Sequence, residues 1–432
     1  MAIGAARGAE DGLARRPPMG WRSWNEFGRQ VNDTVIRQTA DALTVRRNAR
    51  GERDDQDGWS LQDVGYNDVG LDDNWQDCGA GAGKSFHDAN GEPLVNRERF
   101  PDMKAMVDYI HSLGLMAGWY HNNCICPEHS PEIWSNLTHY TGDVEATLRF
   151  GFDSVKLDGC GAFRNLDNWY AEFARASAGA GASSSSSDRT SNSPNKIMIE
   201  NCHWGGDRPH DDWCPFHMFR TSGDIRNTWR SMMGNLQSTL RTSMGPKPLS
   251  RPGCWAYPDM LEVGRMPTAE EDRAHFGAWV ITSSPLILGY DLRSDAVARR
   301  VWRTITDRDV LRVNQDWAGH PGTKVAESPG RGGWKVEVWA KPLSDGAFAV
   351  FVINDNSPYL DGGVDTVHVE LDRAFGAAGQ RYSARDLWAR QDLGTAQGVF
   401  VVEVGGHDSA LVRFDPSADR TSPVPSEFLE AV

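Results

Sequence analysis

No stretch of the sequence approaches the roughly 18 consecutive apolar residues that a membrane-spanning helix needs. The first ten residues also contain no apolar core of a secretory signal, so either a signal has been removed or the chain never had one. Basic residues are in the minority, because 59 acidic side chains stand against 45 basic ones. The net charge of −14 therefore provides no basic surface for DNA or RNA, and we expect a neutral substrate.

The chain also lacks a regular metal-binding pattern. Its seven cysteines are an odd number, so one or more disulfides would leave at least one thiol over. Zinc would need closely paired Cys or His ligands at regular spacing, and the sequence shows none. The candidate ligands would be Cys124, Cys126, Cys202, His203, Cys214 and His217. We therefore expect no metal and no cofactor.

Short β-rich runs alternate with helical patterns over residues 17–322, which is typical of βα units around a parallel sheet. The runs expected to be strands are residues 19–24, 66–71, 115–120, 154–157, 197–200, 218–219, 253–255 and 285–288. Residues 102–113 are typical of the intervening helices, because their apolar side chains recur on one face. Eight such repeats predict an α/β fold, a (β/α)8 TIM barrel.

The pattern changes after the barrel. Residues 323–418 contain short alternating runs separated by Gly, Asp and Pro turns, which predict a C-terminal antiparallel β-sandwich. These runs are residues 334–339, 347–353, 366–371, 399–404 and 410–414. Residues 1–16 and 419–432 are expected to be tails. The Ser-rich stretch 176–195 has nothing to bury and is expected to be a surface loop inserted in the barrel.

Polar side chains follow several of the predicted strands directly. The most informative case is the run 154–160, an apolar strand that ends at Asp158 and a tight turn. The others, in chain order, are Asp72, Asp73, Tyr120, Arg220 and Asp224. Because a (β/α)8 barrel gathers the carboxyl ends of its strands at one face, we expect these side chains to form an active site there.

Asp158 and Asp224 are the candidate catalytic pair. Two carboxyl groups that face each other across a pocket can cleave a glycosidic bond, one as nucleophile or base and the other as acid. Lys156 lies on the same side of its strand as Asp158, where its charge can lower the pKa of that carboxyl. Arg220 could contact sugar hydroxyls beside Asp224. Each pair alone is more typical of a simple ion pair, so the prediction depends on the whole set. The seventeen tryptophans suit stacking on sugars, although most are expected in the core.

Taken together, these segments resemble glycoside hydrolase family 27, the α-galactosidase and α-N-acetylgalactosaminidase family. The motifs that carry the resemblance are residues 17–25, 71–75, 99–102, 111–115, 156–160, 220–224, 258–261 and 314–316. The resemblance covers about residues 16–415. It implies a glycan substrate with terminal α-galactose, no nucleic acid or membrane partner, and a monomer or a homodimer.

The resemblance also implies a role for each residue of the predicted site. Asp158 would be the nucleophile and Asp224 the acid/base of a retaining double displacement. Asp72 and Asp73 would bind the 4- and 6-hydroxyls of the sugar, and Lys156 the 3- and 4-hydroxyls. The remaining contacts would come from Arg220 on the side of the 2-position and from Trp24, Tyr120, Asp259 and Met260 around the pocket.

One position departs from the family. Family α-galactosidases usually carry Glu after the Cys of the fifth-strand loop, and N-acetylgalactosaminidases carry small residues there, whereas this chain has His203. A histidine ring can hydrogen-bond a hydroxyl and would crowd an acetamide. However, Gly205 and Gly206 leave room for a rotamer turned away from the sugar.

We therefore expect an α-galactosidase, with three alternatives. The first is an α-N-acetylgalactosaminidase. The second, a β-L-arabinopyranosidase, is disfavoured because Asp72 is not the longer acid that would fill the space of a 6-hydroxymethyl group. The third is a catalytically silent sugar-binding relative, and the presence of both Asp158 and Asp224 argues against it.

The resemblance further implies disulfide bonds. The implied pairs are Cys160 with Cys124 or Cys126, and Cys202 with Cys214. Such bonds persist in oxidising compartments, so we expect the secretory pathway and, at its end, the cell exterior, a vacuole or a lysosome. The sequons that begin at Asn32 and Asn136 would then be able to carry glycans.

Overall fold

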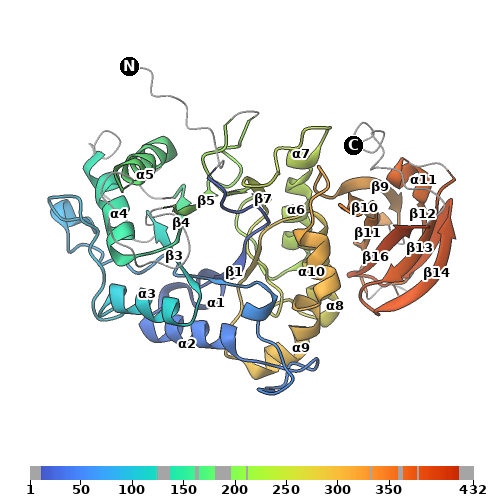
Figure 1. The fold of residues 1–432 in the computed structure, drawn as a ribbon, viewed down its shortest axis with the longest axis horizontal. Coiled ribbons are helices and arrows are strands. Elements are labelled where there is room, and N and C mark those ends of the chain that lie inside the picture. The colour runs from blue at the N-terminus through green and yellow to red at the C-terminus, as the bar shows by residue number, and fades with distance from the viewer. Residues whose placement is uncertain are drawn as a thin grey trace. The chain divides into compact units, whose positions relative to one another are not determined.

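The structure is a computed structural model, and it describes residues 11–122, 124, 137–160, 165–180, 196–210, 213–330, 333–358, 363–376 and 379–417. The chain divides into two compact units, and Figure 1 shows the helices and strands that are described below. The first comprises Met1–Arg47, Arg53–Arg220 and Ile287–Ser294, and the second Asn48–Glu52, Thr221–Leu286 and Asp295–Val432. Among the described residues there is no helix with the length and apolar character of a membrane span.

All eight predicted barrel strands are present, although several are shorter than expected. They are β1 (Met19–Arg22), β2 (Asp68–Gly70), β3 (Met116–His121), β4 (Ser154–Asp158), β5 (Met198–Cys202), β6 (Met218–Arg220), β7 (Trp255–Tyr257) and β8 (Leu286–Leu288). Their order in the sheet is β7-β6-β5-β4-β3-β2-β1-β8. Neighbours from β1 to β6 are parallel, and β8 returns beside β1. This order confirms the predicted TIM-barrel topology.

Helices alternate with these strands. They are α1 (Trp24–Phe27), α2 (Asp33–Thr44), α3 (Met103–Ser112), α4 (Leu137–Phe150), α5 (Leu166–Ala180), α6 (Trp229–Ser238), α7 (Leu240–Ser243), α8 (Ala269–Ile281), α9 (Asp295–Ile305) and α10 (Arg308–Gln315). The predicted helix at 102–113 is α3, and the Asp102 side chain caps it by accepting from the Ala105 N–H at 2.9 Å. Because α5 continues to Ala180, the first residues of the predicted loop 176–195 are helical. Residues 181–195 lie outside the described part.

The C-terminal part of the second unit is the predicted β-sandwich. Its strands are β9 (Thr323–Pro329), β10 (Lys335–Pro342), β11 (Phe348–Asn354), β12 (Asp365–Glu370), β13 (Arg381–Asp386), β14 (Gln391–Gln397), β15 (Val399–Val404) and β16 (Asp408–Pro416), with a short helix α11 (Leu371–Phe375). One sheet has the order β14-β13-β16-β11-β10-β9, and β12 pairs with β15. Alternate side chains of these strands form one apolar core. Three of the strands, β9, β13 and β14, were missed by the sequence pattern.

Helix α8 connects the sandwich to a loop that carries predicted site residues. Its residues are buried on every side, which is typical of a helix enclosed by protein. Gly277 packs so closely on the ring of Phe351 in β11 that a side chain would collide there. On the other side, the Trp279 Nε1–H donates to the Asp259 carbonyl at 2.7 Å. The sandwich therefore supports a helix that fixes the backbone of Asp259.

Candidate active site

The carboxyl ends of neighbouring strands bring the predicted site residues of the first unit together. The parallel register pairs Lys156 with Tyr120 on one side and with Glu200 on the other, and it pairs Asp158 with Cys202. Because side chains alternate along a strand, Lys156 and Asp158 point to the same side of β4. Of the predicted residues, Tyr120 on β3 and Lys156 and Asp158 on β4 therefore come together, with Glu200 and Cys202 of β5 beside them.

Asp158 is held on both carboxylate oxygens. The Tyr120 hydroxyl donates to Oδ2 at 3.1 Å, and the Cys160 N–H donates to Oδ1 at 3.1 Å. The Asn122 side chain donates to the Asp158 carbonyl at 3.0 Å, which fixes the backbone as well. Burial raises the pKa of Asp158, while Lys156 and the Cys160 N–H oppose that rise. The result is a poorly solvated carboxylate with a fixed orientation, as an attacking group requires.

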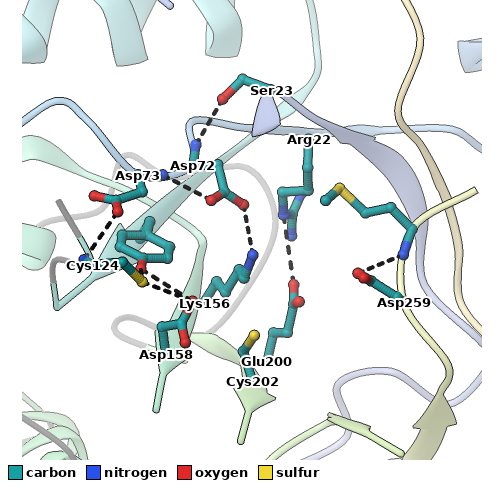
Figure 2. A network of polar contacts seen from close by, with 12 residues as sticks. Arg22, Ser23, Asp72, Asp73, Cys124, Lys156, Asp158, Glu200, Cys202 and Asp259 are labelled. Atoms are coloured by element: carbon teal, nitrogen blue, oxygen red, sulfur yellow. Dashed lines mark hydrogen bonds and ion pairs between the residues drawn. The ribbon is translucent and has the colours of Figure 1, made fainter. Parts of the chain in front are cut away.

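Lys156 forms a buried ion pair with Asp72. Its Nζ lies 2.8 Å from Asp72 Oδ2, and both side chains are almost fully buried. Burial alone would lower the pKa of Lys156, but Asp72 and the other nearby anions outweigh that effect and hold the pKa above its ordinary value. Figure 2 shows that the pair lies directly beside Asp158 and Asp73. The ammonium group is therefore a permanent positive charge in the site.

Asp72 and Asp73 are consecutive, and the backbone turns both of their side chains toward polar partners. The Asp72 N–H donates to Ser23 Oγ at 3.0 Å, and Asp72 Oδ1 accepts from the Asp73 N–H at 2.8 Å. Asp73 Oδ2 accepts from the Cys124 N–H at 3.1 Å. Burial, and to a lesser extent the charge of Asp72, raise the pKa of Asp73 to about 7. Asp73 is thus able to donate a proton as well as accept one near neutral pH.

A disulfide joins the loops that follow β3 and β4. Cys124 and Cys160 are bonded, with their Cα atoms 5.2 Å apart. This confirms the predicted disulfide at Cys160 and selects Cys124 as its partner, whereas Cys126 lies outside the described residues. The bond anchors the turn directly after Asp158.

The predicted pair of Cys202 and Cys214 is wrong. Cys202 is a buried free thiol, whereas Cys214 takes part in a disulfide, as do Cys78 and Cys254. Cys202 ends β5 beside Asp158, and Arg220 Nη1 donates to its sulfur at 3.3 Å. Since side chains alternate along β5, Cys202 points into the barrel mouth, where the sulfur contacts Arg220. Burial, followed by the charge of Asp158, raises the pKa of the Cys202 thiol, so it stays protonated.

Several of the alternative zinc ligands within the described residues have other partners. Cys124 and Cys214 each take part in a disulfide. His217 Nδ1 accepts from the Ile199 N–H at 2.9 Å, and its Nε2 lies 3.1 Å from Asp11 Oδ2. Both ring nitrogens of His217 are therefore engaged in contacts within the protein.

His203 lies against the turn that follows Asp158. Its Nδ1 contacts the carboxylate of Asp207, and a Cβ built on Gly159 would lie only 2.9 Å from Cδ2 of the ring. The histidine side chain is 10% exposed. Asp207 holds the ring over Gly159, so a rotamer turned away from this turn would lose that contact.

The second unit holds Asp224, Asp259 and Met260. Asp224 is exposed in the segment that follows β6. Asp259 Oδ2 accepts from the Ile225 N–H at 2.8 Å, and Oδ1 accepts from the Met260 N–H at 2.8 Å. Asn235 donates to the Gly223 carbonyl at 3.2 Å, so the backbone is held on both sides of Asp224. Asp259 has a φ of 91°, a strained conformation for a non-glycine residue of the kind that clusters at functional sites.

Trp24 begins α1 directly after β1 and is half-buried. Several polar residues beside or beneath the site were missed by the sequence analysis: Arg22, Asp68, Asn122, Glu200 and Asp207. Arg22 and Glu200 did offer a signal, because each is a charged residue inside an otherwise apolar run. Asn122 is distinguished by its φ of 77°, which cannot be read from the sequence and is seen only in the structure.

Comparison with known proteins identifies both parts of the chain. A family model described as alpha galactosidase A matches residues 16–316, and one described as the alpha galactosidase C-terminal beta sandwich domain matches residues 333–414. The chain is 32% identical to the alpha-galactosidase of Cyamopsis tetragonoloba over 415 residues, which cover 94% of this chain and 88% of that protein.

Solved structures show the same fold. Alpha-galactosidase I from Mortierella vinacea has a TM-score of 0.75 and 24% identity, with 96% of this chain and 100% of that chain covered. A family 27 β-L-arabinopyranosidase from Geobacillus stearothermophilus has a TM-score of 0.69 and 21% identity, with 95% and 98% covered. Since enzymes of different specificity share this fold, the fold alone does not select the sugar.

Proposed function

Because this chain belongs to glycoside hydrolase family 27, the alpha-galactosidase family, we propose that it removes terminal α-linked galactose from oligosaccharides or glycoconjugates with retention of configuration. The observation that supports this most is the placement of Asp158. Its carboxylate is fixed at the end of β4, beside the buried ion pair of Lys156 and Asp72. A nucleophile next to charged groups that suit sugar hydroxyls is what an exo-glycosidase requires.

In the first step, a carboxylate oxygen of Asp158 attacks the anomeric carbon. The bond from that carbon to the leaving oxygen breaks, and the proton of the Asp224 carboxyl group passes to the leaving oxygen. In the second step, the Asp224 carboxylate takes a proton from water while the water oxygen attacks the anomeric carbon. The ester bond to Asp158 breaks, and the two carboxyl groups return to their starting states.

The remaining residues hold the sugar. An ammonium group has three N–H donors, and the contact with Asp72 uses one of those of Lys156, which suits it to the 3- and 4-hydroxyls. Asp72 and Asp73 take the 4- and 6-hydroxyls. The other contacts are assigned to Arg220 on the side of the 2-position and to Trp24, Tyr120, Asp259 and Met260 around the pocket.

His203 is proposed to favour galactose over N-acetylgalactosamine. Asp207 and Gly159 hold its ring in place, and a full-sized ring crowds an acetamide while one nitrogen can hydrogen-bond a hydroxyl. On aryl α-glycosides with the same leaving group, we expect kcat/KM to be higher for the galactoside than for the N-acetylgalactosaminide.

His203→Ala should lower galactoside cleavage only modestly, because a hydrogen bond to a neutral hydroxyl contributes about 0.5–1.5 kcal/mol. The same variant should raise the relative kcat/KM for the N-acetyl substrate. The exposed His210, replaced by Ala, is the matched control and should leave the ratio unchanged. A native ratio in favour of the N-acetyl sugar would move the function to α-N-acetylgalactosaminidase.

The disulfide of Cys124 and Cys160 supports an oxidising compartment, and we place the protein in the secretory pathway or beyond it. Glycans at Asn32 and Asn136 would accompany that route; Asn136 lies outside the described residues. A thiol titration of the unfolded, unreduced protein should find fewer than the seven cysteines of the sequence, with Cys202 among those that react. Seven reactive thiols would contradict the assignment.

A further inference from the structure

Three charged side chains lie buried beneath the site and have no part in the mechanism above. They are Arg22 on β1, Asp68 on β2 and Glu200 on β5, and each is only 1–2% exposed. Burying a charge costs several kcal/mol unless a partner compensates it. Three such groups close together in the barrel therefore need a structural or functional explanation.

Arg22 and Asp68 form a fixed clamp. Nη1 and Nη2 of Arg22 donate to the two oxygens of Asp68 at 3.0 and 3.2 Å, and Ser154 Oγ donates to Asp68 at 2.9 Å. Glycines make the space for this clamp. A Cβ on Gly70 would collide with the Arg22 side chain, and one on Gly118 would lie 2.9 Å from Asp68 Oδ1. Neighbouring strands are thus shaped around the guanidinium group.

Glu200 lies between this clamp and Lys156. Its Oε2 is 3.7 Å from Nε of Arg22, as the dashed line in Figure 2 shows. In the β4–β5 register, Glu200 is the direct partner of Lys156, which acts on it electrostatically. Lys156 in turn pairs with Asp72. The buried charges therefore alternate in sign along one series, which we call the charge chain: Asp68, Arg22, Glu200, Lys156 and Asp72.

We propose that Glu200, fixed by Arg22, is a positioning residue whose negative charge helps to hold the Lys156 ammonium group in place in the active site. Glu200 is the partner of Lys156 in the β4–β5 register, and its charge acts on the ammonium group that Asp72 binds. The proposal rests on the proposed function, since Lys156 is assigned to the sugar hydroxyls there.

The charge of Glu200 depends on pH. Burial raises its pKa to about 7, against the opposing charges of Lys156 and Arg22. The other groups that act on it are Asp72, which raises the pKa, and Arg220 on β6, which lowers it; Cys202 on its own strand is a protonated thiol. Glu200 is therefore neutral near pH 5, and the charge chain is complete only near pH 8.

The test compares kcat/KM of Glu200→Gln with that of the native enzyme on an aryl α-galactoside. Glutamine is the neutral isostere of protonated Glu200, so the two enzymes should agree within about twofold near pH 5. Near pH 8 the variant should be slower by roughly tenfold, the loss expected when one buried charge next to Lys156 in the register is removed. A purely structural role for Glu200 would instead lower activity by the same factor at both pH values and would overturn the proposal.

Two further variants support the comparison. Glu200→Asp keeps the charge, so its activity relative to the native enzyme should not fall as the pH rises from 5 to 8. Asp143→Asn removes another buried carboxylate, which lies outside the site and bonds to His87 and Trp169, and it should leave the pH profile unchanged. A shifted profile in Asp143→Asn would assign the effect to general destabilisation.

If Glu200→Gln does not fold, the proposal can be tested with Arg22→Gln instead. Without the guanidinium group the pKa of Glu200 rises, so the gain in activity that accompanies its ionisation should move to higher pH. An unshifted profile would contradict the role of Arg22. If the native enzyme itself does not cleave the galactoside, the proposed function fails rather than the charge chain.

Discussion

Asp158→Asn is expected to remove nearly all turnover, with kcat/KM at least about 10⁴-fold lower, while the protein remains folded. Asparagine has nearly the same shape: its amide oxygen can still accept from the Cys160 N–H, and its NH2 group can donate to the oxygen of the Tyr120 hydroxyl. It has no negative charge and cannot form the glycosyl ester. Steady-state kinetics on an aryl α-galactoside measure the loss, and thermal unfolding checks that the fold is kept.

The control for Asp158→Asn is again Asp143→Asn, which also replaces a buried acid by its amide in the first unit. Asp143→Asn should lower the stability of the protein, because the oxygens of Asp143 accept from His87 and Trp169. It should leave kcat largely intact. Native-like activity of Asp158→Asn would end its assignment as nucleophile. A loss of activity in both variants that follows their loss of stability would do the same.

The barrel could be predicted because its strands carry a strong local signal. Buried parallel strands such as β4 appear as apolar runs, and the polar residues that end them mark the carboxyl edge. The sandwich was harder. β9 and β14 are the edge strands of its larger sheet, and β14 is exposed along nearly all of its length, so no apolar alternation identifies it.

The candidate site also has a part that the sequence could predict and a part that it could not. Asp72, Asp73, Lys156 and Asp158 could be found because each stands at or near the end of a predicted strand. The charge chain could not, because Arg22 and Glu200 are far apart in the sequence and meet only when the barrel forms. The error at Cys202 has a related cause: the family resemblance implied a disulfide with Cys214, but the alternation along β5 turns Cys202 into the barrel beside Arg220.

Asp224→Ala is expected to separate the two steps of catalysis. Cleavage of substrates with poor leaving groups should fall by about 10²–10⁴-fold, since they depend on the proton that Asp224 supplies, whereas activated aryl galactosides should be affected less. The exposed Glu270, replaced by Ala, is the control from the same unit and should behave like the native enzyme. Asp259 and Asn235 hold the backbone on either side of position 224, so the substitution should leave the loop in place.

Azide should then restore part of the activity of Asp224→Ala, because a small anion that needs no base can enter the space left by the carboxylate. Azide would attack the β-linked ester on Asp158 from the opposite face, and the product should be α-galactosyl azide. The native enzyme should likewise release α-galactose first, which NMR of the fresh product can establish. Retention also requires the two carboxyl groups to lie roughly 5–5.5 Å apart, because a separation of roughly 6.5–9.5 Å leaves room for water to attack directly. A β-configured first product would rule out the covalent intermediate and, with it, the assignment of Asp158 as the group that forms it.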